Sequence, residues 1–261
     1  MSIYDTGLTL AYCVAVAFIF GACMGSFLNC TAIRIGRGEN FVKGRSHCMS
    51  CGHDLYLKDL IPIVSWLALK GRCRYCHEKV SGRYVLVEVI FALLTVCCLL
   101  KFDLTILCLR NYIFISLLYL LTLTDLDTMT IPDGCHIIAI IAWAATLPMM
   151  YGRSEILSHV AAAAIFGGAV LALSLIMDRL LGKESMGGGD IKLLAVVGLY
   201  FGFIGTLFVM IISCILGLVF SIAARRKGKA FPFGPWIAMA AVIVLFAGEP
   251  LISWYSGLLG I

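Results

Sequence analysis

The segment Met186-Gly187-Gly188-Gly189-Asp190-Ile191-Lys192-Leu193 sets three glycines and a carboxylate at the start of an apolar run that covers residues 191–224. A run of about 20 apolar residues is long enough to cross the hydrocarbon core of a membrane as a helix. A charged group at the end of such a helix is costly, so Asp190 is a candidate functional residue. Asp125 stands at the end of another apolar run and is its candidate partner.

The composition predicts a chain with many membrane spans. Of its 261 residues, 61% are hydrophobic and 13% are charged, whereas soluble domains are nearer a quarter charged. A backbone in lipid must satisfy its own hydrogen bonds, so we predict an all-α polytopic membrane protein. Its apolar runs predict about eight transmembrane helices, at residues 8–30, 84–100, 104–124, 137–150, 156–181, 191–201, 203–224 and 231–254.

The basic residues predict the orientation of these spans. Of the 20 Lys and Arg, ten lie between residues 34 and 83, four lie in 225–229, and three are Arg179, Lys183 and Lys192. If these groups face the cytoplasm, the positive-inside rule puts the N-terminus and the C-terminus outside. This arrangement requires the long run 191–224 to break near Gly202–Gly205. The net charge of +5 is then explained by the basic residues on the cytoplasmic side of the membrane and does not indicate nucleic-acid binding.

Asp125 and Asp190 both fall at predicted cytoplasmic ends of spans. Two carboxylates that lie close together cannot both ionise cheaply, so one keeps its proton. The ionised carboxylate can take a proton from water while its neighbour protonates the leaving group, as in aspartic proteases. The glycines beside Asp190 allow the backbone to approach an extended substrate. We therefore predict that Asp125 and Asp190 form a catalytic pair.

Helix capping is the alternative for these acids, because Asp is favoured at helix N-termini. Asp127 and Asp133 are expected to cap a helix, to position the loop or to tune the pair. His136 and His159 are isolated and are expected at helix ends or in packing. The sequence lacks the His-Glu-x-x-His and Gly-x-Ser-x-Gly motifs of other hydrolases. A carrier of ions or protons that uses both aspartates as a relay stays open, although it leaves the glycines unexplained.

Four cysteines form two Cys-x-x-Cys pairs, Cys48 with Cys51 and Cys73 with Cys76, in the polar segment 31–83. Four thiolates in such pairs are typical of structural zinc sites, and the predicted cytoplasmic side disfavours disulfides. Disulfides, free thiols or replacement of one ligand by His47, His53 or His77 are the alternatives. The apolar stretch 60–69 is expected to form the core of this zinc module, to dock on the membrane, or both.

With these motifs the chain resembles the prepilin peptidases of type IV pilus and type II secretion systems, a family of Gly-x-Gly-Asp aspartic membrane proteases. The resemblance covers nearly the whole chain, and the family often has Pro where this chain has Met49 and Val85. The motifs that carry it are Gly25-Ser26-Phe27-Leu28-Asn29 with Arg34, both Cys-x-x-Cys pairs, Arg83-Tyr84-x-x-Val87-Glu88, Asp125 through Ile131-Pro132-Asp133, residues 186–193 and Pro232-Phe233-Gly234-Pro235.

The resemblance implies two activities at the cytoplasmic face of the bacterial inner membrane. One removes the basic leader peptide from prepilins or pseudopilins, after a Gly and before the apolar helix. The other methylates the new N-terminus with S-adenosylmethionine, for which the sequence holds no recognisable binding motif. Candidate methylation or positioning residues are Asn29, Arg34, Gly71 and Glu88, with capping and loop geometry as alternatives. A peptidase without methyltransferase activity is the second rival.

The resemblance also implies a division into three parts. Residues 1–30 would be the first transmembrane helix, and residues 31–83 the cytoplasmic zinc module, which would belong to the methyltransferase. Residues 84–261 would form the protease bundle. The expected cofactors are a structural Zn²⁺ and S-adenosylmethionine, and the expected partners are pilin precursors and the lipid bilayer. The oligomeric state is left open.

Overall fold

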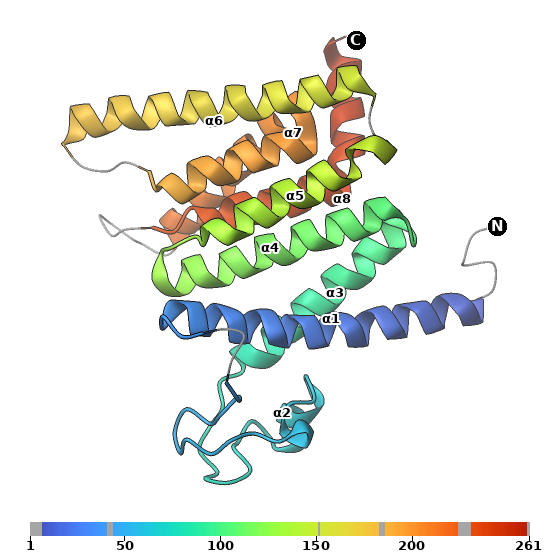
Figure 1. Ribbon diagram of the computed structural model, residues 1–261, viewed down its shortest axis with the longest axis vertical. Coiled ribbons are helices and arrows are strands. Elements are labelled where there is room, and N and C mark those ends of the chain that lie inside the picture. Colours follow the sequence, from blue (N-terminus) through green and yellow to red (C-terminus); the bar gives the residue numbers. More distant parts are fainter. Residues whose placement is uncertain (1–6, 41–43, 151, 183–185, 224–230, 260–261) are drawn as a thin grey trace. The chain divides into compact units, whose positions relative to one another are not determined.

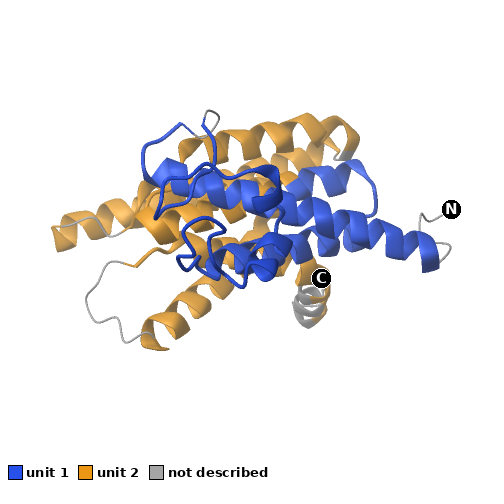
Figure 2. Cartoon of the chain, turned by 90° about the horizontal axis from the view of Figure 1, so that it is seen from below, with its two compact units in different colours: residues 1–112 blue, residues 113–261 orange. Residues whose placement is uncertain are grey.

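The computed structural model describes residues 7–40, 44–150, 152–182, 186–223 and 231–259. Lys183 and the basic cluster at residues 225–229, both used to predict the orientation, lie outside these ranges. The chain divides into two compact units, residues 1–112 and residues 113–261 (Figure 2). The described residues contain helices and two isolated β-bridges but no regular β-strand, which confirms the predicted all-α fold.

Unit 1 is built on two long helices, α1 (Gly7–Gly36) and α3 (Arg83–Phe102), which pack against each other. Glycines of α1 allow this close approach. A Cβ on Gly21 would lie 2.7 Å from the Ala92 Cα, and one on Gly25 would lie 3.2 Å from the Glu88 Cα. Later positions on α1 therefore meet earlier positions on α3, so the two helices are antiparallel.

The segment between α1 and α3 carries the four paired cysteines and has little regular structure. It contains a 3-10 turn, η1 (Leu57–Asp59), the short helix α2 (Val64–Ala68) and two antiparallel bridges, His47 with Asp54 and Arg72 with Lys79. No residue of η1 or α2 is buried, and Leu57, Val64 and Leu67 are well exposed. Much of the apolar stretch 60–69 is therefore exposed, so membrane docking stays a prediction for it.

Unit 2 contains α5 (Asp133–Met150), α6 (Arg153–Leu181), α7 (Gly188–Ala223) and α8 (Gly234–Leu259), and α4 (Ile106–Thr128) enters it at Ile113 (Figure 1). Helix α7 packs against α5, α6 and α8. Tyr200 of α7 shows how the core is tied together. Its ring stacks on Phe114 of α4 with centroids 3.8 Å apart, and its hydroxyl donates a hydrogen bond to the Ala139 carbonyl of α5.

Helix α7 breaks at Gly202, within the stretch where the charge pattern requires a break. Gly202 has φ 63° and ψ −165°, a backbone conformation that is essentially restricted to glycine. Side chains satisfy carbonyls near the break, as the interior of a membrane requires. The Leu199 carbonyl accepts a hydrogen bond from His159 Nδ1 at 2.7 Å, and the Gly202 carbonyl accepts one from the Thr206 hydroxyl at 2.6 Å.

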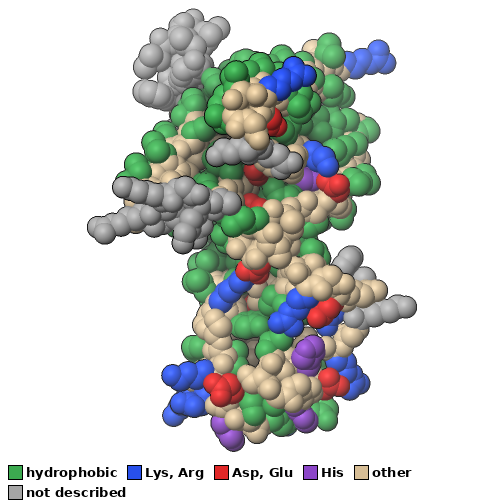
Figure 3. All heavy atoms as spheres, turned by 90° about the vertical axis from the view of Figure 1, so that its left-hand side faces the viewer, with side chains coloured by type: hydrophobic (Ala, Val, Ile, Leu, Met, Phe, Trp, Pro, Cys, Tyr) green, Lys and Arg blue, Asp and Glu red, His purple; other side chains and the backbone are tan. Residues whose placement is uncertain are grey.

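The helices present apolar side chains to their surroundings. Among the described residues, α1, α3, α4, α6 and α7 are long and apolar enough to cross a membrane, and the apolar parts of α5 and α8 are shorter. On the face drawn in Figure 3, many charged and histidine side chains gather over the cysteine-bearing segment, whereas hydrophobic side chains are more frequent over the helices, where some charged ones also appear. These features suggest a multi-pass membrane protein. The count of eight spans stays a prediction.

Candidate functional site

Asp125 lies in the last turn of α4, where the helix is about to end. Its backbone carbonyl accepts the Met129 N–H, and Met129 itself has a left-handed φ of 55° that stops the helix. The side chain is only 5% exposed. The end of α4 thus holds a carboxylate inside unit 2 rather than in solvent.

Asp190 is the third residue of α7 and follows the three glycines. Its N–H donates to the Gly187 carbonyl at 3.1 Å, so it lies in the first helical turn and is not the N-cap that the capping alternative requires. Gly189 packs against the segment that follows Asp125. A Cβ on Gly189 would lie 2.9 Å from the Ile131 Cβ, so the start of α7 and the end of α4 approach each other through this contact.

Gly234, the first residue of α8, lies close to both carboxylates. A Cβ built on Gly234 would lie 2.8 Å from Asp125 Oδ2 and 3.3 Å from Asp190 Oδ1. The two oxygens are therefore separated by no more than the sum of these distances. Both atoms are buried and have no hydrogen-bond partner among the described residues. Three segments of unit 2 that are distant in sequence thus bring two unpartnered carboxylate oxygens together.

A salt bridge holds the nearby starts of α5 and α7. Lys192 Nζ lies 2.7 Å from Asp133 Oδ1, and both side chains are largely exposed. An exposed pair of this kind adds little stability, but it links the two helix starts. A role of Asp133 in positioning the loop stays a prediction, and Asp127 is exposed.

The two isolated histidines have different surroundings. His159 belongs to the break in α7, where it bonds the Leu199 carbonyl. This agrees with the helix-end or packing role expected for it. His136 of α5 is buried, and both of its ring nitrogens lack a hydrogen-bond partner among the described residues. Its side chain lines a hollow of unit 2 together with Asp133 and Lys192.

The four paired cysteines of unit 1 converge on one point. Their sulfur atoms all lie within 4.8 Å of one another, and Cys48 Sγ is 3.9 Å from Cys76 Sγ. A tetrahedral zinc ion with Zn–S bonds of about 2.3 Å places its sulfurs about 3.8 Å apart, so the residues fit this metal. The cluster found among the described residues contains no histidine.

The surroundings shift the pKa values of two of these thiols in opposite directions. N–H groups of Cys51 and Ser50 lower the pKa of Cys48 to about 6, so its thiolate is available at neutral pH. The Glu78 N–H opposes a rise at Cys76, yet burial and the neighbouring thiols raise the pKa of Cys76 to about 12. Such a group gives up its proton when a cation supplies the compensating charge.

Asp59 fastens the cysteine-bearing segment. Its side chain is 3% exposed, its Oδ1 lies 2.6 Å from Arg74 Nε, and its Oδ2 accepts the Tyr75 hydroxyl at 2.9 Å. Burial alone would raise the pKa of the Asp59 carboxyl, but hydrogen bonds from Arg74, Tyr75 and the Tyr56 N–H hold it below its usual value. Arg74 and Tyr75 stand between Cys73 and Cys76, so this acid fixes the second cysteine pair.

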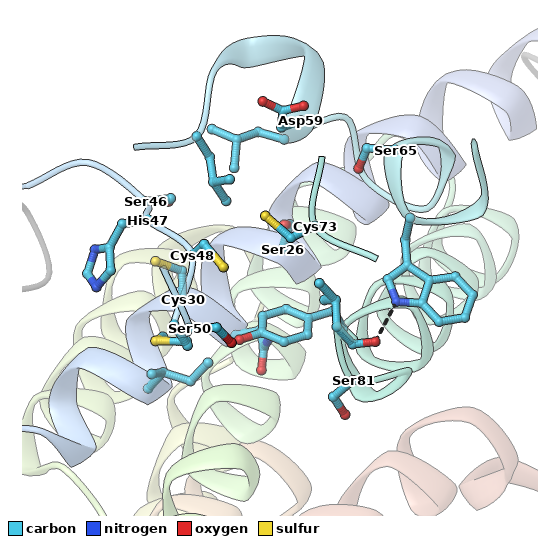
Figure 4. A pocket seen from close by; sticks show the side chains of 18 of the residues that line it. Ser26, Cys30, Ser46, His47, Cys48, Ser50, Asp59, Ser65, Cys73 and Ser81 are labelled. Carbon is cyan, nitrogen blue, oxygen red and sulfur yellow. Dashed lines mark hydrogen bonds between the residues drawn. The ribbon is translucent and has the colours of Figure 1, made fainter. Parts of the chain in front are cut away.

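Unit 1 also contains a partly open cavity of about 420 Å³ beside the cysteines (Figure 4). Asn29 and Arg34 of α1, Glu88 of α3, and Cys48 and Cys73 are among the residues that line it. Three of the four candidate methylation residues therefore share one cavity. The fourth, Gly71, has φ 68° and supports the indole of Trp66, because a Cβ there would lie 2.8 Å from Trp66 Cζ2. Trp66 lines the cavity and donates from Nε1 to the Val80 carbonyl.

Two features of these sites become apparent only in the structure. Gly234 belongs to a stretch that resembles a family motif, and nothing in its neighbours predicts that it lies against two carboxylates. The second feature is the close helix contact at the spacing Gly21-x-x-x-Gly25. Two small residues at this spacing are typical of closely packed membrane helices, and here they mark the contact of α1 with α3.

Comparisons with known proteins identify two matching family models and several relatives. Residues 19–102 match the model of the bacterial peptidase A24 N-terminal domain, and residues 112–222 match that of the type IV leader peptidase family. The prepilin leader peptidase/N-methyltransferase of Aeromonas salmonicida is 32% identical over 272 residues, which cover 92% of this chain and 93% of that protein. Its counterpart in Bacillus subtilis is 30% identical over 249 residues, 93% of this chain and 97% of that protein.

A third relative, the prepilin leader peptidase/N-methyltransferase of Myxococcus xanthus, is 36% identical over 226 residues, covering 81% of this chain and 64% of that protein. No solved structure matches the chain.

Proposed function

Because the chain belongs to the type IV leader peptidase family, we propose that it removes the leader peptide of prepilins or pseudopilins with Asp125 and Asp190 as its catalytic pair. One observation carries the assignment of these residues. A single point beside Gly234 lies within 3.3 Å of a buried, unpartnered oxygen from each carboxylate. A buried carboxylate oxygen without a partner is costly, which supports a functional reason for the arrangement.

The chemistry follows from the sharing of a single proton. Two close carboxylates favour a state in which one is ionised and the other is protonated. The ionised carboxylate would take a proton from a water molecule as that water attacks the scissile carbonyl carbon. The protonated carboxylate would give its proton to the leaving amide nitrogen, which departs as an amine. Which aspartate starts in which state is left open, because the pair titrates as a unit.

The test replaces each aspartate with the isosteric amide. Asp125→Asn and Asp190→Asn should each lower the rate of leader cleavage by at least about 1,000-fold, since neither an acid nor a base remains at that position. Asp127→Asn is the matched comparison, because Asp127 is an exposed acid two residues away on α4; near-normal cleavage by this variant would assign Asp127 a capping or loop role rather than tuning of the pair. Cleavage of a purified model prepilin would be followed by mass spectrometry. Full cleavage by both single variants would remove the pair from the mechanism.

The same preparation separates this function from a carrier of ions or protons. A proton flux across reconstituted vesicles that needs both aspartates, without any cleavage of the prepilin, would favour the carrier. Cleavage without flux would favour the peptidase. The family assignment supports the second outcome.

We also propose that unit 1 supplies the methyl transfer, with a structural Zn²⁺ held by Cys48, Cys51, Cys73 and Cys76. The convergence of the four sulfurs supports the metal, and the names of the relatives support the methyl transfer. The amine exposed by cleavage would take a methyl group from S-adenosylmethionine. The sulfonium then becomes a neutral thioether, and one proton leaves the methylated nitrogen. Mass analysis of the pilin N-terminus distinguishes this from the peptidase-only alternative.

The proposed setting is the bacterial inner membrane, with both termini outside and both active centres on the cytoplasmic side. The distribution of Lys and Arg supports this orientation. The proposed division assigns residues 1–30 to the first span, 31–83 to the zinc module and 84–261 to the protease bundle.

A further inference from the structure

We propose that the cavity of unit 1 is the binding site for the methyl donor, and that Asn29 and Glu88 are the residues that recognise it. The inference rests on the proposed methyl transfer and names the site where it occurs. The cavity of about 420 Å³ is within the usual range for small-molecule sites, and its lining combines buried polar groups with aromatic rings. Four observations within unit 1 carry the assignment.

The packing of α1 on α3 places Asn29 and Glu88 beside the same cavity. Gly21 contacts Ala92 and Thr95, and Gly25 contacts Glu88 and Phe91. Asn29 is one turn beyond Gly25 on the same face of α1, so it faces the first turns of antiparallel α3. Tyr84 and Glu88 occupy those turns, and all three side chains line the cavity. Two facing helices thus present an amide and a carboxylate to the same space.

The side-chain oxygen of Asn29 is a hydrogen-bond acceptor that has no protein donor at the cavity in the described part of the chain. The residue is 2% exposed, and its Oδ1 atom is buried without a partner among the described residues. A buried polar atom of this kind usually has a partner, so an acceptor that lines a cavity indicates that a ligand donates to it. The amino group, the ribose hydroxyls and the adenine amine of S-adenosylmethionine are all donors of the required kind.

Glu88 places a negative charge in the cavity. It is 6% exposed, and its Oε2 atom accepts the Ile63 N–H at 2.7 Å. Ile63 has φ 63°, a conformation that a β-branched residue rarely adopts and that is frequent at functional sites. Asp59, the other well-buried acid of the lining, is already bound by Arg74 and Tyr75. Glu88 is therefore the well-buried acid of the lining that can face a cationic group of the ligand. The basic side chains that also line the cavity would suit the carboxylate of S-adenosylmethionine.

The aromatic part of the lining agrees with a cation. Trp66 is fixed by its hydrogen bond to Val80 and by its contact with Gly71. Together with Tyr84 it gives the cavity two ring systems. Aromatic faces attract sulfonium and ammonium groups in the same way as they attract other cations, and they also stack on purines. S-adenosylmethionine carries both kinds of cation and a purine.

The test measures donor binding directly on the purified, zinc-loaded full chain in detergent. Equilibrium dialysis with labelled S-adenosylmethionine should show binding by the wild type. Asn29→Leu and Glu88→Gln should each weaken that binding at least tenfold. Glu88→Gln keeps an acceptor for the Ile63 N–H and removes only the charge. Asn29→Leu replaces an unpartnered buried amide with an apolar group of the same shape, so the fold should be retained.

Thr31→Val is the matched control for Asn29→Leu. Thr31 is another buried residue of α1 whose Oγ1 atom lacks a partner among the described residues, but it does not line the cavity. Its variant should bind the donor as the wild type does, and leader cleavage and zinc content should be unchanged in all three variants. Wild-type affinity in both Asn29→Leu and Glu88→Gln would overturn the inference.

The outcomes also separate this inference from the proposed function. A wild-type chain that cleaves the prepilin but does not bind the donor would overturn the donor site and leave the peptidase standing. A chain that binds the donor but does not cleave would support the donor site and count against the peptidase.

Discussion

Glycines without room for a side chain define both sites of this protein. At Gly234 the missing side chain leaves space against Asp125 and Asp190, and at Gly71 it leaves space for the ring of Trp66. In neither place does the glycine contribute a chemical group. Each instead permits a close approach that any Cβ would block, so alanine substitution tests the geometry without touching the candidate catalytic or metal-binding groups.

Gly234→Ala should inactivate cleavage while the protein still inserts. The new Cβ would lie 2.8 Å from Asp125 Oδ2 and 3.0 Å from Ile131 Cδ1, so a carboxylate or the helix must shift. A displacement of about 1 Å can cost about 100-fold in rate, and we expect a loss of that order in the cleavage rate. Gly257→Ala on the same helix meets nothing within 4 Å and should cleave normally. A fully active Gly234→Ala variant would contradict the described arrangement of the pair.

Gly71→Ala should affect methylation and spare cleavage. The substitution strains a residue at φ 68° and pushes Trp66 out of the cavity wall, so donor binding should weaken by about tenfold, or about 1.4 kcal/mol. Gly52→Ala carries the same strain at φ 69° but meets nothing within 4 Å. Equal donor binding by the two variants, measured by dialysis, would show that the contact with Trp66 is irrelevant.

The break in α7 shows how one residue divides a helix. At 36 residues, α7 is longer than a single membrane span requires, and the positive-φ glycine ends the first helical stretch. His159 of α6 and Thr206 of α7 accommodate the interrupted hydrogen-bond ladder. A broken helix inside a membrane is tolerated only where such partners are available.

Gly202→Ala should destabilise unit 2. Its conformation is nearly closed to residues with a Cβ, so the cost should be about 1–3 kcal/mol. Gly168→Ala of α6 is the control, because Gly168 is helical and meets nothing within 4 Å, and it should be neutral or slightly stabilising. Thermal unfolding in detergent, followed by circular dichroism, measures both. An unchanged midpoint for Gly202→Ala would mean that the helix does not need the break.

The long helices and their approximate ends could be predicted from the sequence, because hydropathy and length mark the long apolar segments. A break near Gly202–Gly205 was also predictable, since it keeps the basic residues on one side in the predicted orientation. The contact of Gly234 with both aspartates was not predictable. It depends on how α4, α7 and α8 pack, and no local pattern encodes that. The same holds for the salt bridge between Lys192 and Asp133.

Across the whole chain, charge and hydropathy together predict one orientation. Ten of the 20 basic residues lie between Arg34 and Arg83, and the C-terminus is predicted on the opposite side of the membrane from them. Alkaline phosphatase fused after residue 261 should therefore be active, and a fluorescent protein fused there should be dark. The reverse pattern would overturn the orientation, although it would leave the geometry within each unit unchanged.

Because the thiol cluster and the unit 1 cavity share residues, loss of the proposed zinc should also affect methylation of the cleaved product. Cys48 and Cys73 belong both to the thiol cluster and to the wall of the cavity. If the cluster holds zinc as proposed, a cell starved of zinc would lose the order of that wall, whereas Asp125 and Asp190 belong to a different unit. The proposed substrates would then be trimmed but carry a free amine, so their methylation level would record how much metal was available when they were processed.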